Sequence, residues 1–337
     1  IMQNLAQFKL LYVAPERLSQ EGFIDLCQQH QISFFIIDEA HCISQWGHAF
    51  RPEYRQLSRL REFFPKTPIA AFTATATPRV TQDMQDQLSL RDPYVTIASF
   101  DRPNLTIRVF EKHQRDQRLF EILSRYQGQP GIIYGGTRKN VEKTAKKCAQ
   151  KGIKVGVYHA GLSAEERQLC HRNFMRDNID VVVATVAFGM GIHKPNVRYV
   201  VHMDMPQNME QYYQEIGRAG RDGLPSECVM FYGAQDAIMQ KQFLEEIPEE
   251  TVRYELRRKI DQMVAFCQTG ACRRVPLLAY FGQVETETRC DHCDNCVDEV
   301  EMIDGTIIAQ KLLSCIYRLN QRFGLNVIID VVSGAKT

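Results

Sequence analysis

Short apolar runs, separated by stretches with a helical pattern, constrain the fold of this 337-residue chain more than any other feature. The runs lie at residues 10–14, 34–37, 69–73, 131–134, 155–158, 181–184, 199–202 and 228–232. Continuous apolar runs of this length are typical of strands buried on both faces of a parallel sheet. Between two of them, Ser163 and Glu166 have the spacing of a capping box, which predicts that a helix begins there. We therefore predict an α/β fold with two sheets in series.

The pattern changes at two places along the chain. Residues 99–109 separate the two sets of predicted strands and are expected to link them. Residues 236–268 read as charged helix, a cysteine cluster follows, and residues 305–322 read as one amphipathic helix. The chain begins with Ile1, close to the first apolar run, and its last residues read as the start of another structured segment. Both ends are therefore expected to be cut from a longer protein.

Composition excludes some classes of protein. No apolar stretch approaches the ~18 residues that a membrane-spanning helix needs. No stretch of these 337 residues has the pattern of a secretory leader, and the 11 cysteines, an odd number, argue against a disulfide framework and for a reducing, cytoplasmic compartment. The net charge is +1, so binding to nucleic acid would depend on local basic patches.

Asp38 and Glu39 directly follow the apolar run 34–37. In open α/β sheets, ligands bind beyond the carboxyl ends of the strands. An aspartate there can hold Mg²⁺, and a neighbouring glutamate can orient or deprotonate an attacking water. Two solvated acids in a turn are the alternative, but the strand before the pair and the residues after it favour a site.

The stretch after the acid pair is rich in aromatic and cationic side chains. It contains His41, the only tryptophan of the chain, Trp46, and then His48, Phe50 and Arg51. Aromatic faces stack on the bases of single-stranded nucleic acid, and arginine binds phosphate. The alternative is that Trp46 and Phe50 pack under the loop as core residues.

Two basic segments lie further along the chain. Arg218 and Arg221 are one helical turn apart among glycines, an arrangement suited to phosphate, whereas an exposed basic turn is the alternative. Residues 253–264 and 272–275 are also basic, and either a solvated helix face or a DNA contact is consistent with them.

Four cysteines late in the chain have the spacing of a metal site. Cys290, Cys293 and Cys296 form two C-x-x-C steps that share a sulfur, and Cys272 can supply a fourth thiolate. Four sulfur ligands favour a closed, structural zinc site. His292 as a substitute ligand and free surface thiols are the alternatives.

Taken in order, these segments resemble the motifs of the RecQ family of superfamily 2 DNA helicases, which carry a DEAH box. The matching stretches are "YVAPERL" (12–18), "DEAH" (38–41), "FTATAT" (72–77), "GIIYGGTR" (131–138), "VYHAGL" (157–162), residues 181–202 and "QYYQEIGRAGRDG" (211–223). The resemblance implies two RecA-like lobes, the first one incomplete, at 1–104 and 105–235. A helical zinc-binding subdomain at 236–300 and the start of a winged-helix domain at 301–337 would follow.

The resemblance also implies roles for single residues. Asp38 would coordinate magnesium, Glu39 would position the water, and Arg218 and Arg221 would reach the phosphates of ATP, with Arg221 as the arginine finger. The remaining implied residues fall into two groups. Further nucleotide contacts would come from His41, Gln214 and Gly191, and the DNA path and its coupling would involve Trp46, His48, Phe50, Arg51, Arg138 and Thr185.

The phosphate-binding pattern G-x-x-x-x-G-K-[ST] does not occur in the 337 residues, and in this family it precedes the region that Ile1 begins. The expected function is that of an ATP-dependent 3′→5′ DNA helicase in recombination and repair. It would act on single-stranded and partly duplex DNA in a bacterial cytosol or nucleoid, and it would not bind a membrane. Without the phosphate loop, the alternative is a zinc-stabilised module that binds nucleic acid but has no motor activity.

Overall fold

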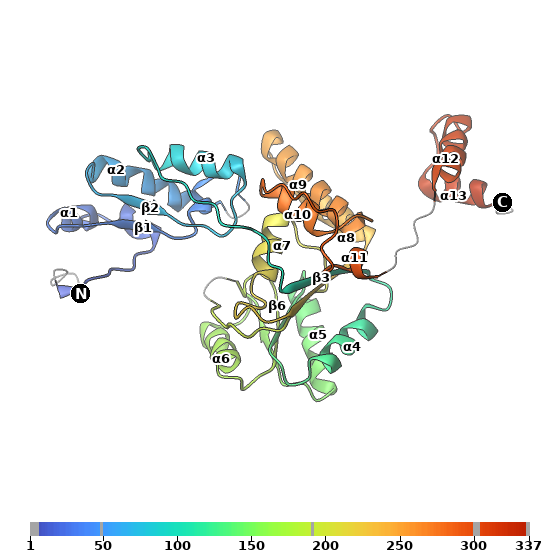
Figure 1. Ribbon diagram of the computed structural model, residues 1–337, viewed down its shortest axis with the longest axis horizontal. Coiled ribbons are helices and arrows are strands. Elements are labelled where there is room, and N and C mark those ends of the chain that lie inside the picture. Colours follow the sequence, from blue (N-terminus) through green and yellow to red (C-terminus); the bar gives the residue numbers. More distant parts are fainter. Residues whose placement is uncertain (1–6, 48–49, 190–191, 299–303, 335–337) are drawn as a thin grey trace. The chain divides into compact units, whose positions relative to one another are not determined.

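The computed structural model describes residues 7–47, 50–189, 192–298 and 304–334 (Figure 1). The chain separates into two compact units, Ile1–Val297 and Asp298–Thr337. Among the described residues, no helix has both the length and the apolar character that crossing a membrane would require.

The first part of the larger unit has a small parallel sheet. Strands β1 (Phe35–Ile37) and β2 (Ile69–Ala71) pair with Phe35 opposite Ile69 and Ile37 opposite Ala71. Three α-helices accompany them: α1 (Phe23–Gln28), α2 (Leu60–Phe63) and α3 (Pro78–Gln87). Three 3-10 helices, Pro15–Ser19, Ala40–Ile43 and Pro52–Arg59, occupy parts of the connections.

The second part is an all-parallel sheet of six strands in the order β3-β8-β7-β4-β6-β5. The strands are β3 (Leu105–Glu111), β4 (Gly131–Tyr134), β5 (Val155–Tyr158), β6 (Val181–Ala184), β7 (Tyr199–His202) and β8 (Ser226–Tyr232). The helices between them are α4 (Arg115–Arg125), α5 (Arg138–Gln150), α6 (Ala164–Met175) and α7 (Met209–Ile216). The predicted capping box at the start of α6 is confirmed, with Ser163 and Glu166 bonding each other's backbone.

Alternate residues of the central strands face two separate cores. Ile132 packs in the core that contains α6 and α7, whereas Ile133 packs in the core that contains α4 and α5. Because side chains along a strand point alternately to opposite faces, continuous apolar runs are needed here. The fully buried runs 131–134, 181–184 and 199–202 therefore confirm the predicted strands.

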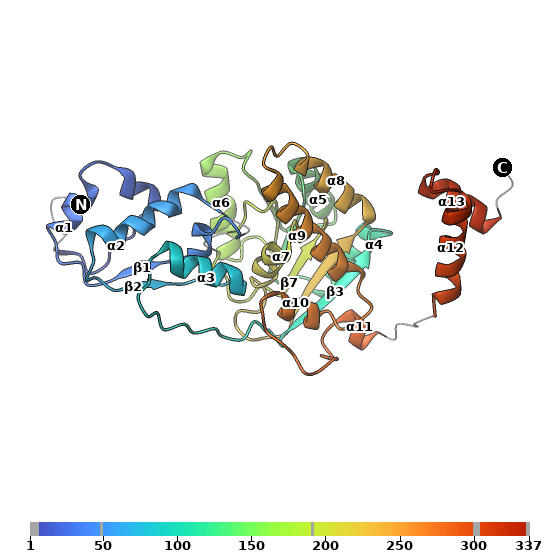
Figure 2. The same cartoon turned by 90° about the horizontal axis from the view of Figure 1, so that it is seen from above.

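Helices α8 (Ala234–Leu244) and α9 (Glu250–Gln268) follow the sheet and lie side by side (Figure 2). Helices α10 (Arg274–Tyr280) and α11 (Asp294–Val297) flank the turn that carries Cys290 and Cys293, and Cys296 lies within α11. This turn covers the open edge of the sheet, where the Ile107 amide donates to the His292 carbonyl at 3.0 Å. Covering an edge strand in this way prevents it from pairing with another chain.

The smaller unit contains α12 (Thr306–Arg318) and α13 (Leu325–Ser333). Helix α12 confirms the amphipathic helix predicted within 305–322. The predicted domain boundaries remain predictions.

Three predictions about the sheets are wrong. Residues 10–14 form no strand, and Tyr12 is 93% exposed, because no other described segment pairs with them. The link between the sheets is shorter than 99–109, since residues from Leu105 onward form β3. Burial on both faces also fails for β1, where Ile36 is 66% exposed.

Candidate functional site

The acid pair lies at the carboxyl end of β1, as predicted. Glu39 has φ 49° and ψ 41°, a left-handed conformation that is uncommon for a residue with a side chain. The Glu39 amide donates to the Asp38 carboxylate at 2.8 Å. Backbone strain of this kind is often found at functional sites, where the surrounding structure maintains it.

His41 connects the acid pair to the "FTATAT" stretch. Its side chain is 1% exposed, and its Nδ1 lies 2.8 Å from the Thr73 hydroxyl and 3.3 Å from a Glu39 carboxylate oxygen. Thr73 follows β2, so the ends of both strands meet at one imidazole. This contact can pass a change at the threonine stretch to the glutamate.

The electrostatic environment of Glu39 has contributions from distant parts of the chain. Burial raises the pKa of this carboxyl, and the charge on Asp38 raises it further. Arg218 and Arg51 act in the opposite direction and lower the same pKa. Arg218 therefore lies within electrostatic reach of the acid pair, although it is 179 positions further along the chain than Glu39.

The two predicted arginines lie beyond the C-terminus of α7. Arg218 is 5% exposed and donates to the Gly189 carbonyl. Its Nε is also buried, and none of the described groups accepts a hydrogen bond from it. Arg221 donates to the Ile192 carbonyl at 2.7 Å, and burial followed by the charge on Arg218 lowers its pKa. Gln214 is half-buried on α7.

The residues predicted to line the DNA path follow the strands of the six-stranded sheet. Arg138 is the first residue of α5, and its guanidinium lies against Gly161, where a Cβ would be 3.0 Å away. Thr185 directly follows β6, and its amide donates to the Tyr158 carbonyl at 3.1 Å. The parallel topology places both residues at the carboxyl edge of this sheet.

Trp46 is half-buried and packs partly against the core of the first lobe. The guanidinium of Arg79 lies 3.7 Å from the centre of its ring, and Arg79 also pairs with Glu255 of α9 at 3.3 Å. The Trp46 carbonyl accepts from Lys259 at 2.8 Å. One face of the indole is thus already covered by a cation. Phe50 is similarly in contact with the Arg55 guanidinium, at 4.9 Å.

The clustered cysteines meet at one point. The sulfur atoms of Cys272, Cys290, Cys293 and Cys296 all lie within 4.8 Å of one another. Tetrahedral zinc with bonds of ~2.3 Å sets sulfurs about 3.8 Å apart, so this donor set fits the ion. The Cys293 sulfur also accepts from the Arg273 amide, and the Cys290 sulfur from the His292 amide. His292 is not part of this group.

In a comparison with known proteins, four family models match successive parts of the chain. They are a DEAD/DEAH box helicase model at residues 1–84, the helicase conserved C-terminal domain at 114–223, the RecQ zinc-binding model at 234–297 and the RQC domain at 299–337. The chain is 47% identical over 326 residues to the ATP-dependent DNA helicase RecQ of Pasteurella multocida, and 41% identical over 330 residues to that of Bacillus subtilis. The chain belongs to the RecQ helicase family.

The matches cover nearly all of this RecQ-family chain but only part of its relatives. They include 97% of the chain and 51% of the Pasteurella protein, and 98% of the chain and 56% of the Bacillus protein. The chain thus spans about half the length of the curated relatives it matches. A solved structure, S. cerevisiae Dbp5 bound to RNA and ADP BeF3, aligns with a TM-score of 0.52 at 20% identity, covering 70% of this chain and 67% of that one. This likeness shows the fold alone and agrees with the predicted α/β class of RecA-like parallel sheets.

The structure adds residues that the RecQ resemblance did not point to. Arg273 and Arg274, in the basic stretch 272–275, are both buried, so neither the solvated nor the DNA-contact interpretation holds for them. Arg273 pairs with Asp294, and Arg274 pairs with Asp101. Lys259 is also buried and pairs with Glu210 at 2.8 Å. Among the earlier predictions, His48 and Gly191 lie outside the described residues.

Proposed function

We propose that this chain is part of an ATP-dependent DNA helicase of the RecQ type, which moves 3′→5′ and serves recombination and repair. The observation that carries the proposal is the electrostatic coupling of Glu39 to Arg218. Acidic and cationic groups around one site are what hydrolysis of a magnesium-bound triphosphate requires. The family membership supports the choice of DNA as the polymer.

Asp38 is proposed to hold Mg²⁺, which would neutralise charge on the phosphates when bound. Glu39 would orient the attacking water and accept its proton, a role for which a carboxyl with a raised pKa is suited. The conformation of Glu39 and its contact with His41 hold the carboxylate at the end of β1.

Arg218 and Arg221 are proposed to stabilise the negative charge that develops on the phosphates. Arginine fingers contribute roughly 10³–10⁵ in rate. The buried Nε of Arg218 is a donor without a partner among the described groups, so it can bind a phosphate oxygen without first breaking a hydrogen bond. Gln214 and the remaining predicted nucleotide contacts are proposed on the basis of the family resemblance alone.

Single-stranded DNA is proposed to pass Arg138 and Thr185 and to contact the Trp46 region. Phosphate contacts and stacking do not distinguish sequences, so the enzyme would follow a strand without reading it. Because Arg79 covers a face of Trp46, a base would have to displace this guanidinium before stacking there. Release of Arg79 would in turn weaken its pair with Glu255 of α9.

The proposal is tested on the complete protein, meaning the full open reading frame that contains these 337 residues. We expect Mg²⁺-dependent ATP hydrolysis that single-stranded DNA stimulates, and unwinding of a partial duplex only when the loading strand allows 3′→5′ movement. DNA binding without any ATP hydrolysis would support the second candidate, a zinc-stabilised binding module. That candidate rests on the absence of G-x-x-x-x-G-K-[ST] from these residues.

Replacement of Trp46 by Ala is expected to lower the stimulation of ATPase by DNA about tenfold or more, and to leave the basal rate within about twofold. Stacking contributes roughly 1–3 kcal/mol per base, which is lost with the ring. ATPase assays with and without single-stranded DNA provide the measurement. Tyr94→Ala is a matched control, because Tyr94 is 94% exposed on the same lobe. A large drop in melting temperature with unchanged stimulation per folded molecule would assign Trp46 to the core.

A further inference from the structure

We propose that Arg102 and Asn104, in the link between the two sheets, are positioning residues for the segment 217–221, and that Arg274 of α10 holds them in place. The inference deepens the proposed function and rests on it, because this segment carries Arg218 and Arg221. The link would then set the geometry of the arginines as well as joining the two sheets.

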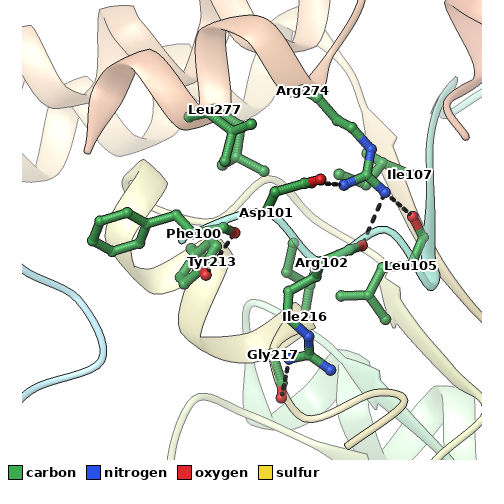
Figure 3. Close-up of a pocket in the computed structure, with 11 residues that line it drawn as sticks. Phe100, Asp101, Arg102, Leu105, Ile107, Tyr213, Ile216, Gly217, Arg274 and Leu277 are labelled. Carbon is green, nitrogen blue, oxygen red and sulfur yellow. Dashed lines mark hydrogen bonds and ion pairs between the residues drawn. The ribbon is translucent and has the colours of Figure 1, made fainter. Parts of the chain in front are cut away.

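Arg102 binds the backbone of the arginine segment. Its guanidinium donates to the carbonyls of Gly217, Ala219 and Gly220 at 3.5, 3.1 and 2.9 Å. These carbonyls lie just beyond the C-terminus of α7, where orphan acceptors and the helix dipole favour a cation. Figure 3 shows the guanidinium of Arg102 directed at Gly217. Only arginine offers enough donors in a planar fork to bind converging carbonyls in this way.

Asn104 binds the same turn from a position two residues further along the link. Its side-chain amide donates to the Gly220 carbonyl at 2.9 Å and to the Leu224 carbonyl at 3.0 Å. Gly220 has φ +57°, and a Cβ there would overlap the Asn104 amide. The turn therefore needs glycine at position 220, and the side chain that binds its carbonyls, Asn104, comes from the link.

Arg274 fixes the link from the other side. It pairs with Asp101 and donates to the carbonyls of Arg102, at 2.9 Å, and Leu105, at 2.6 Å (Figure 3). Arg274 is 6% exposed, so these bonds are shielded from water. Two residues before it, Cys272 belongs to the cysteine cluster, so a continuous set of contacts runs from the cluster to the arginine segment.

The space left around this network is small. Its walls include Tyr213, Ile216 and Leu277, and the remaining cavity has a volume of only about 10 Å³. A space of that size admits at most one water molecule, so the region is a packed joint and not a ligand pocket. In contrast to a solvated link, such a joint can transmit position, because packed interiors do not deform freely.

The test replaces Arg102 by Gln in the complete protein. We expect kcat for DNA-stimulated ATP hydrolysis to fall roughly 10²-fold, as misplacement of a charged group by about 1 Å can do, while KM for ATP changes less than about threefold. Arg102→Lys is expected to recover only part of the loss, because a compact ammonium does not reproduce the planar fork of donors that the guanidinium directs at the carbonyls. Arg91→Gln is a matched control, since Arg91 is an exposed arginine near the same link.

A double-mutant cycle separates positioning from general destabilisation. In an Arg221→Lys background, Arg102→Gln should reduce kcat by less than about twofold, because groups that act through one another are not additive. Equal factors in both backgrounds, or an unchanged kcat in Arg102→Gln, would refute the inference. If Arg102→Gln does not fold, Asn104→Ala undergoes the same cycle. A wild-type protein without ATPase activity would instead overturn the proposed function itself.

Discussion

Replacement of Glu39 by Gln in the complete protein is expected to abolish ATP hydrolysis while ATP still binds. The amide keeps the shape of the side chain but cannot accept a proton from water, and loss of a general base costs typically 10²–10⁴ in rate. Asp38, the proposed magnesium ligand, is unchanged. Steady-state ATPase assays and equilibrium binding of a fluorescent ATP analogue measure the two effects separately.

The same substitution is expected not to lower stability. The pKa of Glu39 is raised in the folded protein, chiefly by burial. A raised carboxyl pKa means that the folded state holds the proton more tightly than the unfolded state, so ionisation near neutral pH opposes folding. The neutral amide of the Glu39→Gln variant removes this opposing charge. Correspondingly, as the pH is lowered, the wild-type enzyme should lose ATPase activity at a higher pH than it would if Glu39 had the ordinary pKa of a glutamate.

Glu53→Gln serves as the control, because Glu53 is an exposed acid close in sequence. It should have the kcat and the melting temperature of the wild type. Near-normal hydrolysis in Glu39→Gln would exclude the proposed base. A collapse of melting temperature would instead show that Glu39 has mainly a structural role.

The sequence predicted the central strands of the second sheet well because they are buried on both faces, whereas edge strand β3 was read as part of the link. The runs 131–134 and 181–184 match β4 and β6 residue for residue, since no strand position there had to be polar. The first sheet was harder, because an apolar run does not reveal whether a partner strand is present. Residues 10–14 read like the others, yet none of the described residues pairs with them.

The candidate site was predicted only where residues with a recognisable chemical role lie close together in the sequence. The acid pair and the four cysteines are local patterns, and the structure brings each group together. Arg102, Asn104 and Arg274 were missed, because an arginine that binds buried carbonyls looks in sequence like one in solvent. Their partners lie more than one hundred residues away, and only the folded chain shows those contacts.

Replacement of Cys293 by Ser is expected to give the largest loss of stability. Cys293 is fully buried, and the turn around it bonds to β3. Apparent binding energies for structural zinc are roughly 10–16 kcal/mol at pH 7, and this energy is folding energy. A hydroxyl is a poor substitute for a thiolate ligand, so the variant should bind little zinc and accumulate as insoluble protein. Metal analysis and thermal melting of freshly purified protein are the measurements.

Cys315→Ser is the matched control, because Cys315 lies on α12, outside the four-cysteine group. It should keep the zinc content and the melting temperature of the wild type. Wild-type protein without zinc, or an equally stable Cys293→Ser, would contradict a structural metal site. Acid should have a similar effect to the substitution, since protons compete with the metal for thiolates.

Loss of zinc is also expected to lower the rate of ATP hydrolysis before the second sheet unfolds. Arg273 bonds to a cluster sulfur through its backbone, and its neighbour Arg274 fixes the link that carries Arg102. Partial removal of zinc with a chelator should therefore lower kcat for ATP, as Arg102→Gln does, at temperatures where the far-ultraviolet circular dichroism is unchanged. If kcat falls only in parallel with the circular dichroism, the cluster contributes stability alone, and the contacts through Arg274 do not transmit its state to the arginines.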